Sequence, residues 1–400
     1  MFIPLSDQPN PKGIPAVNYL LLGLNLAVFL FYSLPLMYQA PAPGDPDLAE
    51  FLRVLSGQLG GKIDVSSEIL SRISAHDLAL FRHGFRPAHP QIIDLLTSMF
   101  LHAGWLHLIG NMLFLWIYGD NVEYRLGRAG YLASYLGTGI AATLFHSFMQ
   151  PGSELPMVGA SGAISGVLGF YFVCFPRNQV RVLLFFFPIF YRIVLMPARW
   201  VLAIYLVMYN LLPFLLSTGR GGGVAHGAHI GGFLAGMGAA YLLRGWEVNR
   251  RPAGFRRKRD RSGEEGLPGT DSLSGALRDG RLEKAAAAYF RLSRNQARNL
   301  ITPEDLLRLA DFLREENQAD GALSLYQRLL ADYPKFGARD QAHLGAGLVQ
   351  FYGRRQPTAA YQHFLSVLDL DPSPAVTIRA RQEVSRIQHL QKLQIRGREG

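Results

Sequence analysis

Six long stretches without a charged side chain dominate the hydrophobic pattern of this chain. Asp, Glu, Lys and Arg are absent from residues 13–44, 95–119, 129–153, 155–176, 200–219 and 221–243. A helix needs about 20 mainly apolar residues to cross the hydrocarbon core of a bilayer. The pattern therefore predicts six transmembrane helices, and it excludes a soluble protein.

Residues 182–191 are also apolar, but they are too few to cross a bilayer. Pro188 would interrupt a helix there, so we expect an interfacial or re-entrant connection. The first long stretch follows Lys12 and precedes an Ala-Pro-Ala sequence, which would also fit a signal sequence. It is longer than a typical signal core, and this length favours a retained span.

The formal net charge of +10 is concentrated just after the sixth stretch. Residues 244–261 contain eight Arg or Lys and two acidic residues. Such a cluster holds a cytoplasmic flank in place and attracts anionic lipid headgroups. We therefore expect both termini in the cytoplasm, membrane lipids as partners and no nucleic-acid binding.

The composition changes again after a basic linker at 246–272. Residues 273–390 read as a soluble helical domain, and a basic tail follows at 391–400. Small and aromatic residues recur there at separations of 37 and 38 residues, in Ala285–Tyr289, Ala322–Tyr326 and Ala360–Phe364. The pattern resembles tetratricopeptide helix pairs, with a plain helical bundle as the alternative. A cytoplasmic protein or peptide is the partner expected at 273–390. Thr302 followed by Pro303 predicts a helix start.

Polar side chains occur at similar depth in three of the six stretches. The second contains His102, His107 and Asn111, the fourth contains Ser161, and the sixth contains His229. Ser161 lies seven residues past Glu154 and His229 nine past Arg220, which places both roughly 10–14 Å inside the outer boundary. Glycines spaced four apart, Gly162 with Gly166 and Gly232 with Gly236, would let these helix backbones approach closely.

A serine and a histidine at one depth favour nucleophilic catalysis. A neutral imidazole can take the proton of a serine hydroxyl near neutral pH. The six stretches contain no Asp or Glu, so the sequence predicts a Ser–His dyad in place of a triad. The single cysteine, Cys174, leaves too few ligands for a Cys-based metal site, and we expect no metal or cofactor.

Three motifs in this order resemble those of the rhomboid intramembrane serine proteases. LHAGWLHLIGNM at 101–112 fits their H-x4-H-x3-N pattern, GASG at 159–162 their nucleophile motif, and AHIGG at 228–232 their catalytic-histidine helix. GDNVEYRLG at 119–127 resembles their loop after the second span. The resemblance covers roughly residues 17–245. Two features depart from the family pattern, FRHGFRP at 81–87 in place of a Trp-Arg pair and a serine at position 165.

The resemblance implies a role for each matching position. Ser161 would be the nucleophile and His229 the general base. His107, Asn111 and the Ser161 backbone N–H would form the oxyanion hole. The remaining motif positions would support the site: His102, Gly159, Gly162 and Gly232.

Together these features predict an all-α polytopic membrane protein, a rhomboid-like bundle of six helices followed by a soluble α-helical repeat domain. The expected parts are a cytoplasmic segment at 1–16, the membrane domain at 17–245, and the linker, repeat domain and tail given above. The expected function is an endopeptidase that cleaves transmembrane segments of single-span proteins through an acyl-enzyme, in a bacterial inner membrane. A non-proteolytic scaffold that binds transmembrane helices and recruits a partner through its tail is the main alternative, and a transporter is a third.

Overall fold

The computed structural model describes residues 2–11, 13–42, 44–58, 72–186, 190–216, 225–249 and 269–396. The chain divides into two compact units. Unit 1 comprises Met1–Asp7 and Gly13–Ala240, and unit 2 comprises Gln8–Lys12 and Tyr241–Gly400. Most of the expected basic linker, the last four residues of the basic tail and the Arg220 boundary lie outside the described residues.

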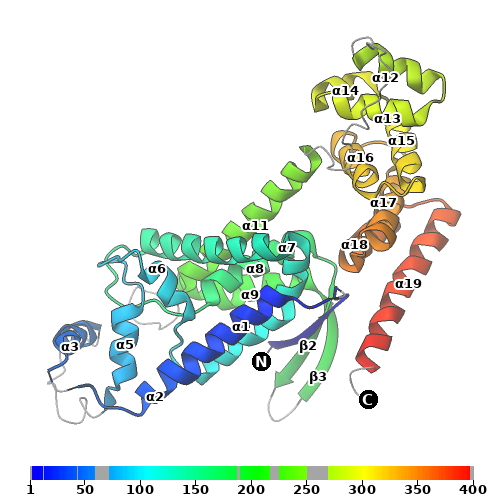
Figure 1. The fold of residues 1–400 in the computed structure, drawn as a ribbon. Helices are drawn as coiled ribbons and strands as arrows, with labels where there is room; N and C mark the ends of the chain where they lie inside the picture. The colour runs from blue at the N-terminus through cyan, green and yellow to red at the C-terminus, as the bar shows by residue number, and fades with distance from the viewer. Residues whose placement is uncertain are drawn as a thin grey trace. The chain divides into compact units, whose positions relative to one another are not determined.

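Helices make up most of unit 1 (Figure 1). In chain order they are α1 (Ala16–Val28), η1 (Phe29–Ser33), α2 (Leu34–Met37), α3 (Pro46–Gln58), α5 (Ala75–His83), α6 (Asp94–Thr97), η2 (Ser98–Phe100), α7 (Trp105–Met149), α8 (Ser161–Cys174), α9 (Ala198–Leu206), η3 (Val207–Leu211), α10 (Leu212–Leu216) and α11 (His226–Asn249).

A bend divides the long helix α7 into two arms that correspond to the second and third apolar stretches. Gly127 has φ 73° and ψ 165° at this point, a conformation that glycine adopts without a Cβ penalty. Close to the bend, the Glu123 carboxylate accepts the backbone N–H groups of Val17 at 3.1 Å and Asn18 at 2.7 Å. These N–H groups start α1 and have no acceptor inside the helix. Glu123 therefore ties the first apolar helix to α7.

Two helices among the described residues are long and apolar enough to cross a membrane, Ala16–Met37 and Ala198–Leu216. A third candidate is the bent pair Asp94–Phe100 and Trp105–Met149, whose axes differ by 94°. Helix α8 has only 14 residues, and histidine and glycine reduce the apolar character of α11. Length and composition therefore identify fewer spans than the six that the charge pattern predicts.

A three-stranded sheet accompanies the helices of unit 1, so the described residues are mostly helical and not all-α as expected. Strands β1 (Phe2–Gln8), β2 (Gln179–Phe186) and β3 (Phe190–Pro197) lie in that order. The antiparallel pair β2–β3 runs from Gln179 opposite Pro197 to Phe186 opposite Phe190. Residues 182–186 and 190–191 therefore belong to an antiparallel strand pair, so they are not helical, and the expected interfacial or re-entrant location of this segment stays a prediction. The physical reason for the strand pair is β-branched side chains at alternate positions, with Val180 and Val182 fully buried around Arg181.

Unit 2 is built from paired helices. They are α12 (Gly269–Arg278), α13 (Leu282–Arg291), α14 (Arg294–Leu300), α15 (Pro303–Glu315), α16 (Ala319–Asp332), α17 (Arg339–Leu348), η4 (Val349–Gly353), α18 (Pro357–Leu368) and α19 (Pro374–Arg396). The pairs α12–α13, α15–α16 and α17–α18 pack closely. The three recurring sequence segments begin near the start of α13, α16 and α18, the second helix of each pair.

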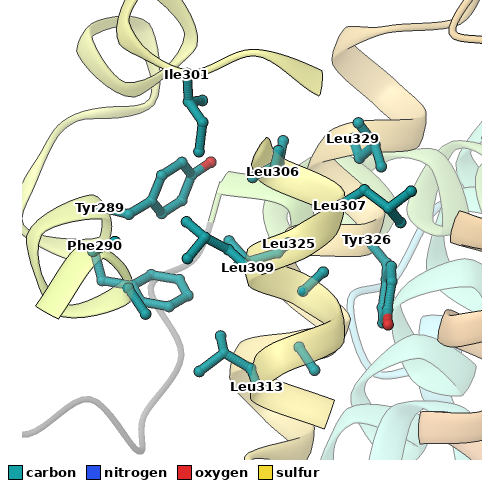
Figure 2. Packing of buried hydrophobic residues seen from close by; sticks show 14 of the residues in the cluster. Tyr289, Phe290, Ile301, Leu306, Leu307, Leu309, Leu313, Leu325, Tyr326 and Leu329 are labelled. Carbon is teal, nitrogen blue, oxygen red and sulfur yellow. The ribbon is translucent and has the colours of Figure 1, made fainter. Parts of the chain in front are cut away.

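The small and aromatic residues of these segments form the core of unit 2. Ala322, Tyr326, Ala360 and Phe364 are fully buried. Figure 2 shows side chains from α13, α15 and α16 meeting in one apolar cluster. The predicted helix start at Thr302 is confirmed, because its hydroxyl accepts the backbone N–H of Asp305 at 3.1 Å. The tetratricopeptide identity of the pairs stays a prediction.

Candidate active site

Ser161 is the first residue of α8, and the segment before it is fixed by backbone hydrogen bonds. Met157 exchanges two backbone bonds with Phe85, at 2.8 and 3.0 Å. The N–H of Gly159 donates to the carbonyl of Ser98 at 2.8 Å. Because the first N–H groups of a helix have no acceptor inside it, the N–H of Ser161 has no partner within α8. Residues far apart in the sequence thus hold the start of α8 in place.

Ser161 and His229 are in direct contact. The Nε2 atom of His229 lies 2.7 Å from the Oγ atom of Ser161, within the 2.6–3.2 Å that proton transfer requires. His229 lies in the first turn of α11, and Ser161 opens α8. The structure therefore places together the two residues whose chemistry the sequence singled out.

Glycines make this contact possible, as their spacing predicts. A Cβ atom added at Gly232 would clash with the carbonyl oxygen of Gly162, and one added at Gly236 would clash with that of Gly166. The close approach of the α8 and α11 backbones is therefore confirmed. Larger residues would separate the helices that carry Ser161 and His229.

A third side chain, which the sequence analysis did not identify, contacts the other nitrogen of the imidazole. The Oδ1 atom of Asn210 lies 2.6 Å from Nδ1 of His229. Asn210 belongs to η3 and is 1% exposed. The only available signal was that Asn210 is the single amide side chain in the stretch 200–219. Without an acid there, the sequence pointed to a two-residue site.

His107 and Asn111 lie beside Gly159, two residues before Ser161. A Cβ added at Gly159 would lie 2.6 Å from Nε2 of His107 and 3.5 Å from Nδ2 of Asn111. The two side chains are four residues apart on α7 and share one face. The structure thus brings the expected oxyanion-hole side chains close to the start of α8.

The remaining histidines have neighbours in the same region. His102 is fully buried, and its ring packs edge-on against that of His107 with centroids 5.1 Å apart. His226 interacts with the backbone carbonyl of Tyr209 in η3. A Cβ added at Gly227 would lie 3.3 Å from Nδ1 of His146. The contacts of His226 and Gly227 link α11 to η3 and α7, and the supporting role of His102 stays a prediction.

Ion pairs form between α3 and the segments that lie before α6 and before α8. Arg53 of α3 pairs with Glu154 at 2.7 Å and Arg86 pairs with Glu50 at 2.6 Å. The hydrogen bond from Arg53 lowers the pKa of Glu154 below its usual value. The Arg53–Glu154 pair and the Phe85–Met157 bridge connect α3 and Phe85 to the segment that precedes Ser161, whereas the Arg86–Glu50 pair ties α3 to the residues after α5.

We expect Gly159→Ala to reduce activity strongly. The φ of Gly159 is 119°, where side chains are strained, and the added methyl would strike the His107 ring. His107 is one of the expected oxyanion donors, and loss of one such donor costs about 10²–10³ in rate. Labelling by a fluorescent serine-hydrolase probe measures the effect. Gly152→Ala is the matched control, because an added Cβ meets nothing within 4 Å there; equal labelling of the two variants would contradict the prediction.

Comparison with known sequences agrees with this arrangement. Residues 89–246 match the sequence model of the rhomboid domain. The matched region contains Ser161, His229, Asn210, His107 and Asn111. The similar proteins include two that are named rhomboid proteases, one of them as putative.

Three similar proteins show how identity and coverage vary among the relatives. The chain is 32% identical over 171 residues to "Rhomboid protein 1, mitochondrial" of Saccharomyces cerevisiae, covering 42% of this chain and 45% of that protein. It is 32% identical over 114 residues to "Putative rhomboid protease YdcA" of Bacillus subtilis, covering 27% and 57%. It is 43% identical over 75 residues to "Rhomboid protease GluP" of the same species, covering 19% and 14%. The chain thus spans about half the length of the first two relatives.

Proposed function

We propose that this chain is an intramembrane serine endopeptidase that cleaves transmembrane segments of single-span membrane proteins. The observation that carries the proposal is the 2.7 Å separation of Ser161 Oγ and His229 Nε2. Protease relatives of the rhomboid domain support the same activity.

The chemistry follows from the atoms at the start of α8. His229 removes the proton of the Ser161 hydroxyl while Oγ attacks the carbonyl carbon of a peptide bond. The negative oxygen that develops is stabilised by the N–H of Ser161 and by side-chain donors of His107 and Asn111. His229 then protonates the leaving amine, and water hydrolyses the acyl-enzyme. Exclusion of bulk water would strengthen the hydrogen bonds to the negative oxygen. Hydrolysis of the acyl-enzyme nevertheless needs a water molecule that reaches Ser161 inside the membrane.

A substrate helix must unwind before it reaches Ser161, because its peptide groups are bonded within the helix. Segments with glycine, proline or other weak helix formers are therefore the expected substrates. The six-span arrangement, cytoplasmic termini, contact with membrane lipids and a bacterial inner membrane belong to the same proposal. They are supported by the charge pattern of the sequence and by the bacterial relatives.

Unit 2 offers a groove for a cytoplasmic protein or peptide. It has a volume of about 470 Å³, and its lining includes Phe312 and Phe336 beside three acids and one base, which are Glu304, Asp311, Glu315 and Arg308. Apolar and acidic side chains together suit a segment with apolar and basic residues. This groove supports a recruiting role for residues 273–390.

The proposal is tested by reconstituting the full chain in liposomes with a single-span protein. One substrate carries a glycine- and proline-containing span, and a second carries a polyleucine span of equal length. We expect cleavage within the first span and little cleavage of the second, measured by mass spectrometry of the products. Binding of both substrates without cleavage would favour the scaffold alternative.

A further inference from the structure

We infer that Asn210 is a positioning residue that holds His229 in the tautomer able to accept the Ser161 proton. The inference rests on the proposed function, because it assigns a role within that site. Asn210 touches neither the nucleophile nor the expected substrate position, and it would act only through the imidazole.

The His229 ring contacts a different side chain at each of its two nitrogens. Ser161 Oγ lies 2.7 Å from Nε2, and Asn210 Oδ1 lies 2.6 Å from Nδ1. Asn210 is 1% exposed, so water does not compete for its side chain. Both ring nitrogens are thus engaged, one by the nucleophile and one by the amide.

The backbone of the preceding turn determines which way the amide faces. The Nδ2 group of Asn210 donates to the carbonyl oxygen of Tyr205 at 2.9 Å. A carbonyl oxygen only accepts hydrogen bonds, so the atom facing Tyr205 must be the NH₂ group. The amide oxygen therefore faces His229. Because that oxygen also only accepts, Nδ1 of His229 must carry the proton, which leaves a lone pair on Nε2 toward Ser161.

Neighbouring helices hold this turn in place. Asn210 lies in the π-helical segment η3, a wider turn that is often found at functional sites. The hydroxyl of Tyr205 lies 3.4 Å from Oγ of Ser165 on α8. Its ring packs on Phe114 of α7 with centroids 5.2 Å apart. The serine at position 165, a departure from the family pattern, thus contacts the residue whose carbonyl orients Asn210.

The contact would matter most when charge develops. Once His229 has taken the Ser161 proton, Nδ1–H of the imidazolium donates a charge-assisted hydrogen bond to the amide oxygen. A neutral amide orients the ring without the cost of burying a second charge. Asn210 would therefore serve the orienting role that a carboxylate has in a Ser–His–Asp triad.

The tautomer can be read directly in the wild-type protein. Full-length chain with ¹⁵N-labelled histidine is studied by NMR in detergent, and His229→Ala identifies the His229 signals. We expect a protonated Nδ1 and an unprotonated Nε2 at neutral pH. A His229 imidazole protonated on Nε2 alone would overturn the inference, and this result requires no substitution of Asn210.

Two substitutions at Asn210 and one matched control then measure the effect on rate. Loss of a hydrogen bond to a charged group predicts about a 10- to 100-fold lower rate of probe labelling for Asn210→Leu. Asn210→Asp keeps an acceptor for Nδ1 but loses the donor to the Tyr205 carbonyl, so we expect activity between that of Asn210→Leu and wild type, and an acidic limb of the rate profile at higher pH. Asn25→Leu removes another buried amide, one that donates to its own helix at Leu21, 2.8 Å away; it should keep the wild-type rate and profile.

The outcomes separate this inference from the proposed function. No labelling of folded wild type would contradict the proposed protease. If Asn210→Leu is labelled at the wild-type rate and with the wild-type pH profile, and this labelling depends on Ser161, the positioning role of Asn210 is contradicted. The proposed protease function would still stand. If Asn210→Leu does not fold, the test relies on Asn210→Asp and on the NMR spectrum of wild type. The positioning role of Asn210 would be overturned if Asn210→Asp had the pH profile of wild type and if the wild-type His229 ring were a mixture of the two tautomers.

Discussion

Replacing Ser161 by alanine should abolish both probe labelling and cleavage of a single-span substrate. The hydroxyl that attacks the peptide carbonyl is removed, and no other hydroxyl lies as close to His229 Nε2 among the hydrogen bonds of the described residues. Loss of the nucleophile in serine proteases reduces the rate by at least about 10⁴-fold. His229→Ala should have a similar effect, because the two residues act as one unit. Gel fluorescence and product mass spectrometry measure the two activities.

A buried serine elsewhere provides the control for this experiment. Ser33 lies in η1 and is fully buried, and Ser33→Ala should label as wild type does. Labelling that survives in Ser161→Ala would place the reactive serine elsewhere. If Ser161→Ala abolishes labelling and His229→Ala leaves it intact, Ser161 would be the reactive serine but His229 would not be the base that activates it.

The residues that the sequence predicts best are those that combine a reactive side chain with a regular spacing in an apolar stretch. Ser161 and His229 stand out because polar groups are costly inside apolar stretches. The glycine spacing also anticipated the backbone contact between α8 and α11. Asn210 was missed because an amide carries no charge, and its role depends on a π-helical turn and the Tyr205 carbonyl. Such tertiary details leave no local pattern in a single sequence.

The fold shows the same division between local and long-range information. The Thr302 cap and the paired helices of unit 2 follow from local signals. The hairpin β2–β3 was missed because a short apolar segment with a proline suits several structures, and only pairing decides among them. The strand at Phe2–Gln8 depends on β2, which is far away in the sequence. Apolar runs alone predict helices and carry no signal for a sheet whose strands are far apart in the sequence.

Gly236→Ala should destabilise unit 1, although it adds only a methyl group. The new Cβ would overlap the carbonyl oxygen of Gly166 on α8, and neither backbone can rotate away as a side chain would. Overpacking a tight contact costs about 1–3 kcal/mol, or about 2–12 °C in melting midpoint for a unit of this size. Cys174 is the only cysteine of the chain and is buried on the same helix α8. A fluorogenic thiol reagent therefore reports the unfolding temperature of this helix.

Gly238→Ala, two residues further along α11, supplies the matched control. An added Cβ there meets nothing within 4 Å. Because alanine favours the helix over glycine by about 0.8–1 kcal/mol, this variant should unfold at the same temperature as wild type or slightly above it. Equal midpoints for both variants would mean that α8 and α11 separate easily. The Ser161–His229 distance would then depend on something other than the glycine contact, and Gly236→Ala should also keep its probe labelling.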